Sequence, residues 1–280
     1  MTDAAGLFVR ATDGARARVL LDGAQVTSWF PAGALYDRLF VSERAEYGLS
    51  VSVRGGIPIC FPQFGPFGAL PQHGFARNSR WTVADDSRCE QGELRLRLTE
   101  RDLSPAIAEA ARTAWPHAFA AELFVRVRDD SLAVTLGVTN TGTSPFTFTA
   151  AFHPYFAVRD AFATQVLGLA GLTYRDALLA GAEQLEGVGA LEIRAPLDRI
   201  YYDAPDTLEL REPHRTLRLE KSGFADAVVW NPGVEGTASR RDFAPGDEQQ
   251  MLCVEAAQVR TPITLAAGAR WSGSQRMIAG

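Results

Sequence analysis

The segment ELRLRLTE, residues 93–100, decides the fold class because its side chains alternate with a period of two. Leucine occupies every second position, and arginine or threonine occupies the positions between. Successive side chains of a β-strand point to opposite faces of its sheet, so this alternation is typical of a strand with one buried face. The segment therefore predicts a half-buried strand.

The same alternation recurs on both sides of this segment. In LFVRVRDDSLAVTLGVTNTG, residues 123–142, two apolar runs flank the turn-forming residues 129–131, which predicts an antiparallel hairpin. Residues 191–223 supply further short strands separated by proline and glycine. The one good helix candidate is residues 103–115, with Ser104 as N-cap and Pro105 at the first helical position.

These signals lack the alternation of strands and helices that a parallel sheet requires. We therefore predict an all-β fold, in which two large antiparallel sheets pack face to face as a β-sandwich. We expect residues 1–280 to form a single domain with at most one or two short helices.

Composition narrows the class of protein. The net charge of −5 gives no overall attraction to nucleic acid or to anionic membranes. The three cysteines are far apart and show no CxxC spacing, which favours reduced thiols over a disulfide framework or a zinc site. The chain has no apolar run of a length that could span a membrane and no leader-like start. We expect a cytoplasmic monomer without nucleic-acid or membrane partners.

The segment RGGIPICFPQFGPFGALPQHGFARNSRW, residues 54–81, is rich in proline and glycine, and therefore predicts a stiff, irregular structure. It carries Arg54, Gln72, His73 and Arg77. Each arginine presents a planar fork that suits phosphate or carboxylate, so the two arginines together could hold one anionic group. The alternative is that both form structural salt bridges.

His153 is a candidate general acid. As a strand, residues 144–158 place Phe146, Phe148 and Phe152 on one face and His153 at the end of the other, where Pro154 stops the strand. The ordinary pKa of histidine lies near neutrality, which suits proton transfer. The alternative is a buried histidine whose ring bonds to a backbone group.

Glu255 is a candidate base. In QQMLCVEAAQV, residues 249–259, Glu255 shares the face of Met251 and Cys253, so its carboxylate lies on a buried side. Buried carboxylates must be paired or neutralised, and catalytic bases often occupy such places. A structural salt bridge is the alternative. Asp198 and Asp226 also adjoin apolar strand residues, and either could instead cap a turn or pair with an arginine.

Six motifs, taken in order, resemble the aldose 1-epimerase (mutarotase) superfamily, and within it the glucose-6-phosphate 1-epimerase branch, which acts on hexose 6-phosphates. They are RGGIPICFPQFGP, PQHGFARNSRW, FHPYFAV, LDRIYYD, DAVVWNP and MLCVEAAQV, and they run from residue 54 to residue 259. The resemblance implies a supersandwich fold, an isomerase that needs no cofactor or metal, and a small sugar phosphate as partner.

The resemblance also implies a role for individual residues. His153 matches the general acid of the family and Glu255 its general base. Positions that bind substrate in the family are matched by Arg54, Gln72, Arg77 and Asp198, and His73 resembles a second histidine that contacts the sugar. Gln63 and Gly233 depart from the family pattern, in which Trp and a bulky residue are common, and this puts substrate choice in doubt.

Three alternative functions remain open from the residues. The protein could be a mutarotase for unphosphorylated aldoses, or a carbohydrate-binding module without turnover. It could also be a glycosidase that uses paired carboxylates such as Asp198 and Glu255. The joint presence of an acid and a base at His153 and Glu255 argues against a pure binding module.

Overall fold

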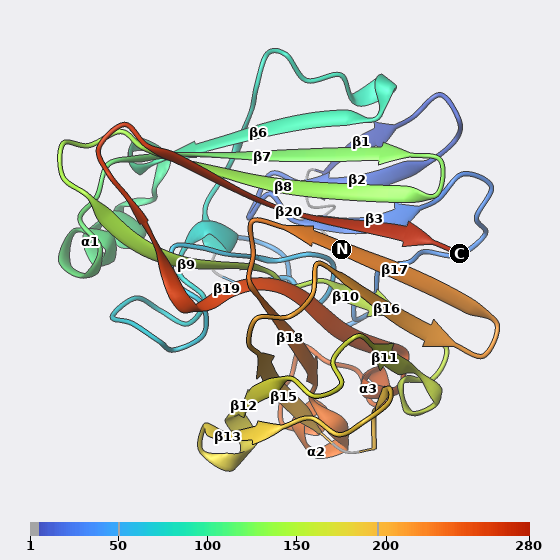
Figure 1. Ribbon diagram of the computed structural model, residues 1–280. Coiled ribbons are helices and arrows are strands. Elements are labelled where there is room, and N and C mark those ends of the chain that lie inside the picture. The colour runs from blue at the N-terminus through green and yellow to red at the C-terminus, as the bar shows by residue number, and fades with distance from the viewer. Residues whose placement is uncertain (1–5, 50, 195) are drawn as a thin grey trace.

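The computed structural model describes residues 6–49, 51–194 and 196–280, and its regular structure is mostly antiparallel β-sheet (Figure 1). The predicted all-β class is confirmed. The described residues form two large sheets, of eight and nine strands, and a three-stranded sheet that the sequence did not predict.

The eight-stranded sheet carries the candidate site. Its strands in spatial order are β13 (Ala182–Leu185), β12 (Thr173–Asp176), β15 (Leu197–Tyr201), β18 (Asp226–Asn231), β19 (Met251–Leu265), β9 (Phe146–Phe152) and β4 (Ile59–Cys60), and β10 (Tyr155–Ala157) also pairs with β19.

The nine-stranded sheet forms the opposite layer. Its strands in spatial order are β14 (Leu191–Glu192), β11 (Gln165–Leu167), β16 (Thr207–Glu212), β17 (Arg215–Ser222), β20 (Arg270–Ala279), β8 (Ser131–Asn140), β7 (Phe119–Arg128), β6 (Glu93–Thr99) and β5 (Thr82–Val83). The third sheet consists of β1 (Gly6–Arg10), β2 (Arg16–Leu20) and β3 (Val26–Phe30). It contacts β6 and β7 of the nine-stranded sheet.

The predicted hairpin is confirmed. Strands β7 and β8 pair from Phe119↔Asn140 to Arg128↔Ser131, which leaves Asp129 and Asp130 as a two-residue turn. Asp129 has a φ of 50°, the left-handed conformation that aspartate tolerates in tight hairpin turns. Strand β6, the segment quoted first above, pairs along the other side of β7.

Helices are few and short. The predicted helix is α1 (Pro105–Ala114), with Ser104 at its N-cap and proline in its first turn. The described residues also contain α2 (Gly233–Ala238) and α3 (Asp247–Gln250), one helix more than expected. These helices span six and four residues, too few for an apolar period to show in the sequence. No helix in the described part of the chain is both long and apolar enough to cross a membrane.

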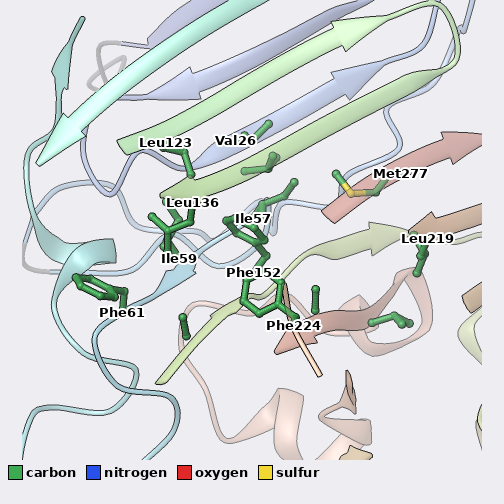
Figure 2. Packing of buried hydrophobic residues seen from close by; sticks show 14 of the residues in the cluster. Val26, Ile57, Ile59, Phe61, Leu123, Leu136, Phe152, Leu219, Phe224 and Met277 are labelled. Atoms are coloured by element: carbon green, nitrogen blue, oxygen red, sulfur yellow. The ribbon is translucent and has the colours of Figure 1, made fainter. Parts of the chain in front are cut away.

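One hydrophobic cluster joins the three sheets. It extends from Val9 in β1 to Met277 in β20. Figure 2 shows Phe152 of β9 among residues of the other layers, with Val26 and Leu136 above it. The Phe152 and Phe224 rings meet edge to face at 5.5 Å. Because this cluster covers the inner face of the eight-stranded sheet, the other face of that sheet is free to form a site.

Candidate active site

A cavity of about 430 Å³ lies over the outer face of the eight-stranded sheet. Its floor comes from β12, β15, β18 and β19, and its rim comes from the proline- and glycine-rich segment that begins at Arg54. Along β19, Leu252, Val254 and Ala256 belong to the large core cluster. Glu255 therefore points to the opposite face, as the period-two pattern predicted.

Strand register orders the floor residues. Arg175, Ile200, Val228 and Glu255 are successive partners across β12, β15, β18 and β19, so they form one row. Adjacent strands lie about 4.8 Å apart, which separates the backbones of Arg175 and Glu255 by about 14 Å. The row is long enough to lie under a whole sugar ring.

His153 lies at the end of β9, where Pro154 separates that strand from β10. Its imidazole stacks on Tyr155 at a centroid distance of 5.0 Å and meets Trp230 edge to face at 5.8 Å. Its Nε2 lies 3.3 Å from Oε1 of Glu255. The ring thus contacts a carboxyl group, and the alternative of a ring bonded to the backbone does not hold among the described residues.

Burial controls the protonation of this pair, since His153 and Glu255 are only 9% and 2% exposed. Burial raises the pKa of Glu255 well above its ordinary value, and the charge of Asp198 adds to the effect. Burial also lowers the pKa of His153, and electrostatic repulsion from Arg77, Arg54 and any proton on His73 lowers it further. In the protein alone, these shifts favour a neutral His153 imidazole beside a protonated Glu255 carboxyl group.

Arg54 is fixed at the rim. Its guanidinium forms a salt bridge of 3.0 Å with Asp242, and its Nη1 donates a 2.9 Å hydrogen bond to the Tyr155 hydroxyl. The two glycines that follow Arg54 allow a close approach of the chain. A Cβ on Gly55 would lie 2.3 Å from the Phe40 carbonyl oxygen, and one on Gly56 2.2 Å from that of Val26. The RGG sequence therefore sets where Arg54 enters the cavity.

Arg77 is less completely paired. Its Nη2 donates to the Gln72 carbonyl oxygen at 2.8 Å, and its buried Nε has no hydrogen-bond partner among the described residues. No carboxylate in the described part of the chain lies within 4.0 Å of its guanidinium. Arg77 is half-buried, and a partly buried cation without an anionic partner is costly, so an anionic ligand would satisfy it.

The two aspartates differ in position. Asp198 lines the cavity, and burial raises its pKa to about 6, with a further contribution from Asp176. Asp226 accepts hydrogen bonds from the backbone N–H groups of Val259 and Arg260, both at 2.8 Å. It therefore fixes the chain after the buried part of β19, in the manner of the turn-capping alternative.

The structure brings all seven candidate residues to this one cavity: Arg54, Gln72, His73, Arg77, His153, Asp198 and Glu255. The lining also includes polar and aromatic side chains that the motifs did not assign to the site, among them Tyr155, Arg175, Trp230 and Arg240. Tyr155 and Trp230 lie within quoted motifs, so the motifs contained a signal for them. The two arginines lie outside every motif, and only the tertiary structure reveals them.

The two departures from the family pattern lie outside the cavity lining. Gln63 is buried, and its amide nitrogen donates to the carbonyl oxygens of Gly65 and Leu70, each at 3.0 Å. Gly233 has a φ of 63°, and a Cβ there would lie 2.5 Å from Cγ of Pro196. Both residues therefore act on the shape of the loops around the site.

No group of three or more His, Cys, Asp or Glu side chains within the described residues is arranged to hold a metal ion. The cavity contains the acid–base groups His153, Glu255 and Asp198 together with several arginines. This arrangement can exchange protons with a bound hydroxyl or ether oxygen while holding an anionic substituent.

Comparison with known proteins gives a consistent result. The family model described as aldose 1-epimerase matches residues 8–277. A Cenchrus ciliaris protein, named provisionally as a glucose-6-phosphate 1-epimerase, is 38% identical over 262 residues, which are 92% of this chain and 79% of that protein. An Escherichia coli K12 protein of the same provisional name is 30% identical over 247 residues, 86% of this chain and 79% of its own.

Solved structures share the fold. A Salmonella typhimurium protein, described provisionally as a mutarotase, superposes with a TM-score of 0.83 at 27% identity, over 95% of this chain and 87% of that one. A Synechocystis protein superposes with a TM-score of 0.81 at 22% identity, over 99% of this chain and 96% of its own. At 22% identity, the likeness to the Synechocystis protein shows a shared fold and nothing further.

Proposed function

This chain belongs to the aldose 1-epimerase family, and from that membership we propose that it interconverts the α and β anomers of hexose 6-phosphates, glucose 6-phosphate among them. The observation that carries the proposal is the buried pair of His153 Nε2 and Glu255 Oε1, 3.3 Å apart, in a cavity that also contains Arg54 and Arg77.

Ring opening requires two proton transfers. The Glu255 carboxylate takes the proton from the C1 hydroxyl, while the His153 imidazolium gives a proton to the ring oxygen. The bond between C1 and the ring oxygen breaks, its electron pair stays on that oxygen, and C1 becomes an aldehyde carbon. Rotation about the C1–C2 bond exposes the other face of the carbonyl, and the reverse transfers close the ring as the other anomer.

The dry environment of the pair favours this sequence. Before ring opening the pair is an imidazolium and a carboxylate, and afterwards it is a neutral imidazole and a carboxylic acid. Both states hold the same number of protons, so no proton need enter from solvent during the step. Burial shifts both pKa values towards the neutral state, which is the state that accompanies the open-chain sugar.

A phosphate at C6 fits beside the arginines. C6 is attached to C5, the neighbour of the ring oxygen, so the phosphate lies on the His153 side of the sugar. Arg54 and Arg77 lie on that side, close enough for their charges to lower the pKa of His153. A bound phosphate would offset those charges and restore basicity to His153. The phosphate therefore orients the sugar and helps to keep the acid protonated.

The remaining hydroxyl groups face Asp198 and Arg175. Asp198 lies on β15, and Arg175 lies on β12, one strand further from Glu255. Gln72 and His73 complete the rim with groups that can hydrogen-bond to sugar hydroxyls.

One-dimensional exchange NMR tests the proposal by measuring the rate of α-to-β interconversion of glucose 6-phosphate, with free glucose in parallel. We expect acceleration of the phosphorylated sugar and a loss of about 10²–10⁴-fold in His153→Asn and in Glu255→Gln. His117→Asn, which alters a histidine outside the cavity lining, is the matched control.

Two outcomes would contradict the proposal. Equal acceleration of glucose and glucose 6-phosphate would assign the protein to the aldose 1-epimerases that act on free sugars. Acceleration of neither sugar, with binding retained, would indicate a carbohydrate-binding module.

A further inference from the structure

His73 is held on one side of its ring by two hydrogen-bonding groups. Its Nδ1 lies 3.2 Å from the backbone nitrogen of Gly65 and 3.2 Å from the thiol sulfur of Cys60. Both contacts are buried, and Cys60 is fully enclosed by the protein. The described part of the chain contains no disulfide that would consume this thiol.

The chemistry of these groups fixes where the proton of His73 lies. A backbone N–H can only donate, so Nδ1 must offer a lone pair and cannot carry a proton. Burial raises the pKa of Cys60 far above its ordinary value, which keeps the sulfur protonated and able to donate to the same lone pair. The proton of the neutral ring is therefore on Nε2, the atom 3.3 Å from Nε2 of the Gln72 side chain.

We propose that Cys60 is a positioning residue, which together with the Gly65 amide holds His73 in the Nε2–H tautomer and makes it a fixed, neutral hydrogen-bond donor to a sugar oxygen. The donor role rests on the function proposed above, whereas the tautomer does not. In the structure Nε2 of Gln72 is the amide atom that faces Nε2 of His73, so this tautomer requires the Gln72 amide to turn over and present its oxygen as the acceptor.

This arrangement also protects the acid of the site. The rings of His73 and His153 are 5.7 Å apart, and Arg54 and Arg77 already place positive charge beside them. A second proton on His73 would have to enter at Nδ1, where it would point at the two donors. Burial and the two arginines also lower the pKa of His73, to about 3. Nδ1 of His153 has no hydrogen-bond partner among the described residues, so His153 is the imidazole of the pair that can accept a second proton without meeting a donor.

The backbone conformation of His73 also supports its contact with Gly65. His73 has a φ of 66°, a left-handed conformation that is unfavourable for a residue with a large side chain. Its N–H donates to the Gly65 carbonyl oxygen at 3.0 Å, so the two residues hold each other through a pair of hydrogen bonds. Strained conformations of this kind concentrate at functional sites.

Long-range ¹H–¹⁵N NMR of protein labelled at its histidines measures the tautomer directly, without substrate. The chain has only four histidines, so His117→Gln and His214→Gln complete the assignment together with His153→Asn. We expect His73 to show a protonated Nε2 and an unprotonated Nδ1, and to remain neutral from about pH 5 to about pH 8. A protonated Nδ1, or ordinary titration near the usual histidine pKa, would overturn the proposal.

Variants test the part played by the thiol. Cys60→Ala should shift the Nδ1 signal of His73 towards the protonated form at acid pH and lower kcat for glucose 6-phosphate about fivefold, since it removes one hydrogen bond. Cys60→Ser retains a donor and should lie closer to the wild type in both measurements. Cys253→Ala removes another fully buried thiol and should leave the His73 tautomer unchanged.

The outcomes separate the two proposals. If Cys60→Ala matches the wild type in both the NMR signal and kcat, Cys60 has no positioning role. If His73 shows the expected tautomer but no sugar phosphate is turned over, the proton placement stands and the proposed function fails.

Discussion

The charge on single side chains in this cavity depends on burial more than on pairing. Glu255, His153 and Asp198 all have pKa values moved towards their neutral forms, and burial is the first cause in each case. Oε2 of Glu255 and Nδ1 of His153 are also buried without a hydrogen-bond partner in the described part of the chain. Buried polar atoms without a partner lower the free energy of unfolding of the protein without substrate, so the groups that suit this site to proton transfer also reduce its stability.

The raised pKa of Asp198 makes the stability of the protein depend on pH. Its pKa is about 6 in the folded protein and 3.8 as the ordinary value, so the folded state binds the proton more tightly. The stability from that proton is complete below about pH 4 and is lost as the pH rises through about 6. Near neutral pH, Asp198→Asn should raise the free energy of unfolding by about 1–2 kcal/mol, and near pH 4 it should change little.

Urea unfolding at both pH values measures this effect, with the exposed Asp85→Asn as control. Equal effects of Asp198→Asn at the two pH values would show that the raised pKa is wrong.

Substitution of Arg77 tests whether its charge determines the preference for a phosphorylated sugar. Its guanidinium lacks a carboxylate partner among the described residues, so we expect it to bind the phosphate. Arg77→Gln should raise KM for glucose 6-phosphate by about 10-fold or more, because a charge-assisted hydrogen bond contributes about 1.5–3 kcal/mol. Turnover of free glucose should not fall, since the loss of this charge also relieves the depressed pKa of His153.

Steady-state kinetics on both sugars, with Arg175→Gln as a second variant at the far end of the cavity, measures the difference. An equal loss on the two sugars in Arg77→Gln would refute a phosphate-binding role for Arg77.

At the scale of elements, one buried glutamine organises the irregular rim. The Gln63 side chain donates to the carbonyl oxygens of Gly65 and Leu70 and accepts from the Leu70 N–H at 3.0 Å. A rigid rim without regular secondary structure needs such side-chain bonds, because its backbone groups have no ladder to join. Gln63, where the resemblance described above implies a tryptophan, therefore bears on loop shape before it bears on sugar stacking.

Gln63→Leu should leave buried polar groups of Gly65 and Leu70 unpaired and cost about 1–3 kcal/mol of stability. Amide hydrogen exchange of residues 65–71 should accelerate, and KM for glucose 6-phosphate should rise because His73 and Gln72 lie on the same loop. Gln249→Leu, at an exposed position in α3, is the control. Unchanged exchange in the Gln63 variant would show that the loop is held by other contacts.

At the scale of the whole molecule, a shared core links the site to every layer. Phe152 immediately precedes His153, and its side chain lies in the cluster that extends from Val9 to Met277. The position of His153 is thus set by packing between the sheets. The expectation that residues 1–280 form one domain, and that the protein is a monomer, stays a prediction.

Unfolding tests the single-domain prediction. Because one cluster includes residues of all three sheets, far-UV circular dichroism and tryptophan fluorescence should report one coincident transition. Trp29 in β3 and Trp230 in β18 serve as reporters of different sheets. Phe152→Ala should lower the free energy of unfolding by about 3–5 kcal/mol, and the two signals should report the same decrease. Two separated transitions would show that the chain contains more than one cooperative unit.

The sequence by itself determined the fold class and the chemical types of the site. Period-two alternation in residues 93–100 and 123–142 is a local property, because the alternation of apolar and polar residues within one strand shows which of its faces is buried. The turn at Asp129 and the helix after Ser104 are also local, and both were predicted correctly. The motifs marked seven residues that the structure gathers at one cavity.

Only the tertiary structure decided how these residues meet. The contact of His153 with Glu255 depends on the register of β9 and β10 against β19, a strand about a hundred positions later in the chain, and packing sets that register. Arg175 and Arg240 join the cavity through the same long-range geometry, and no local pattern marks them. The protonation of the pair follows from burial, which is a property of the assembled fold and of no segment alone.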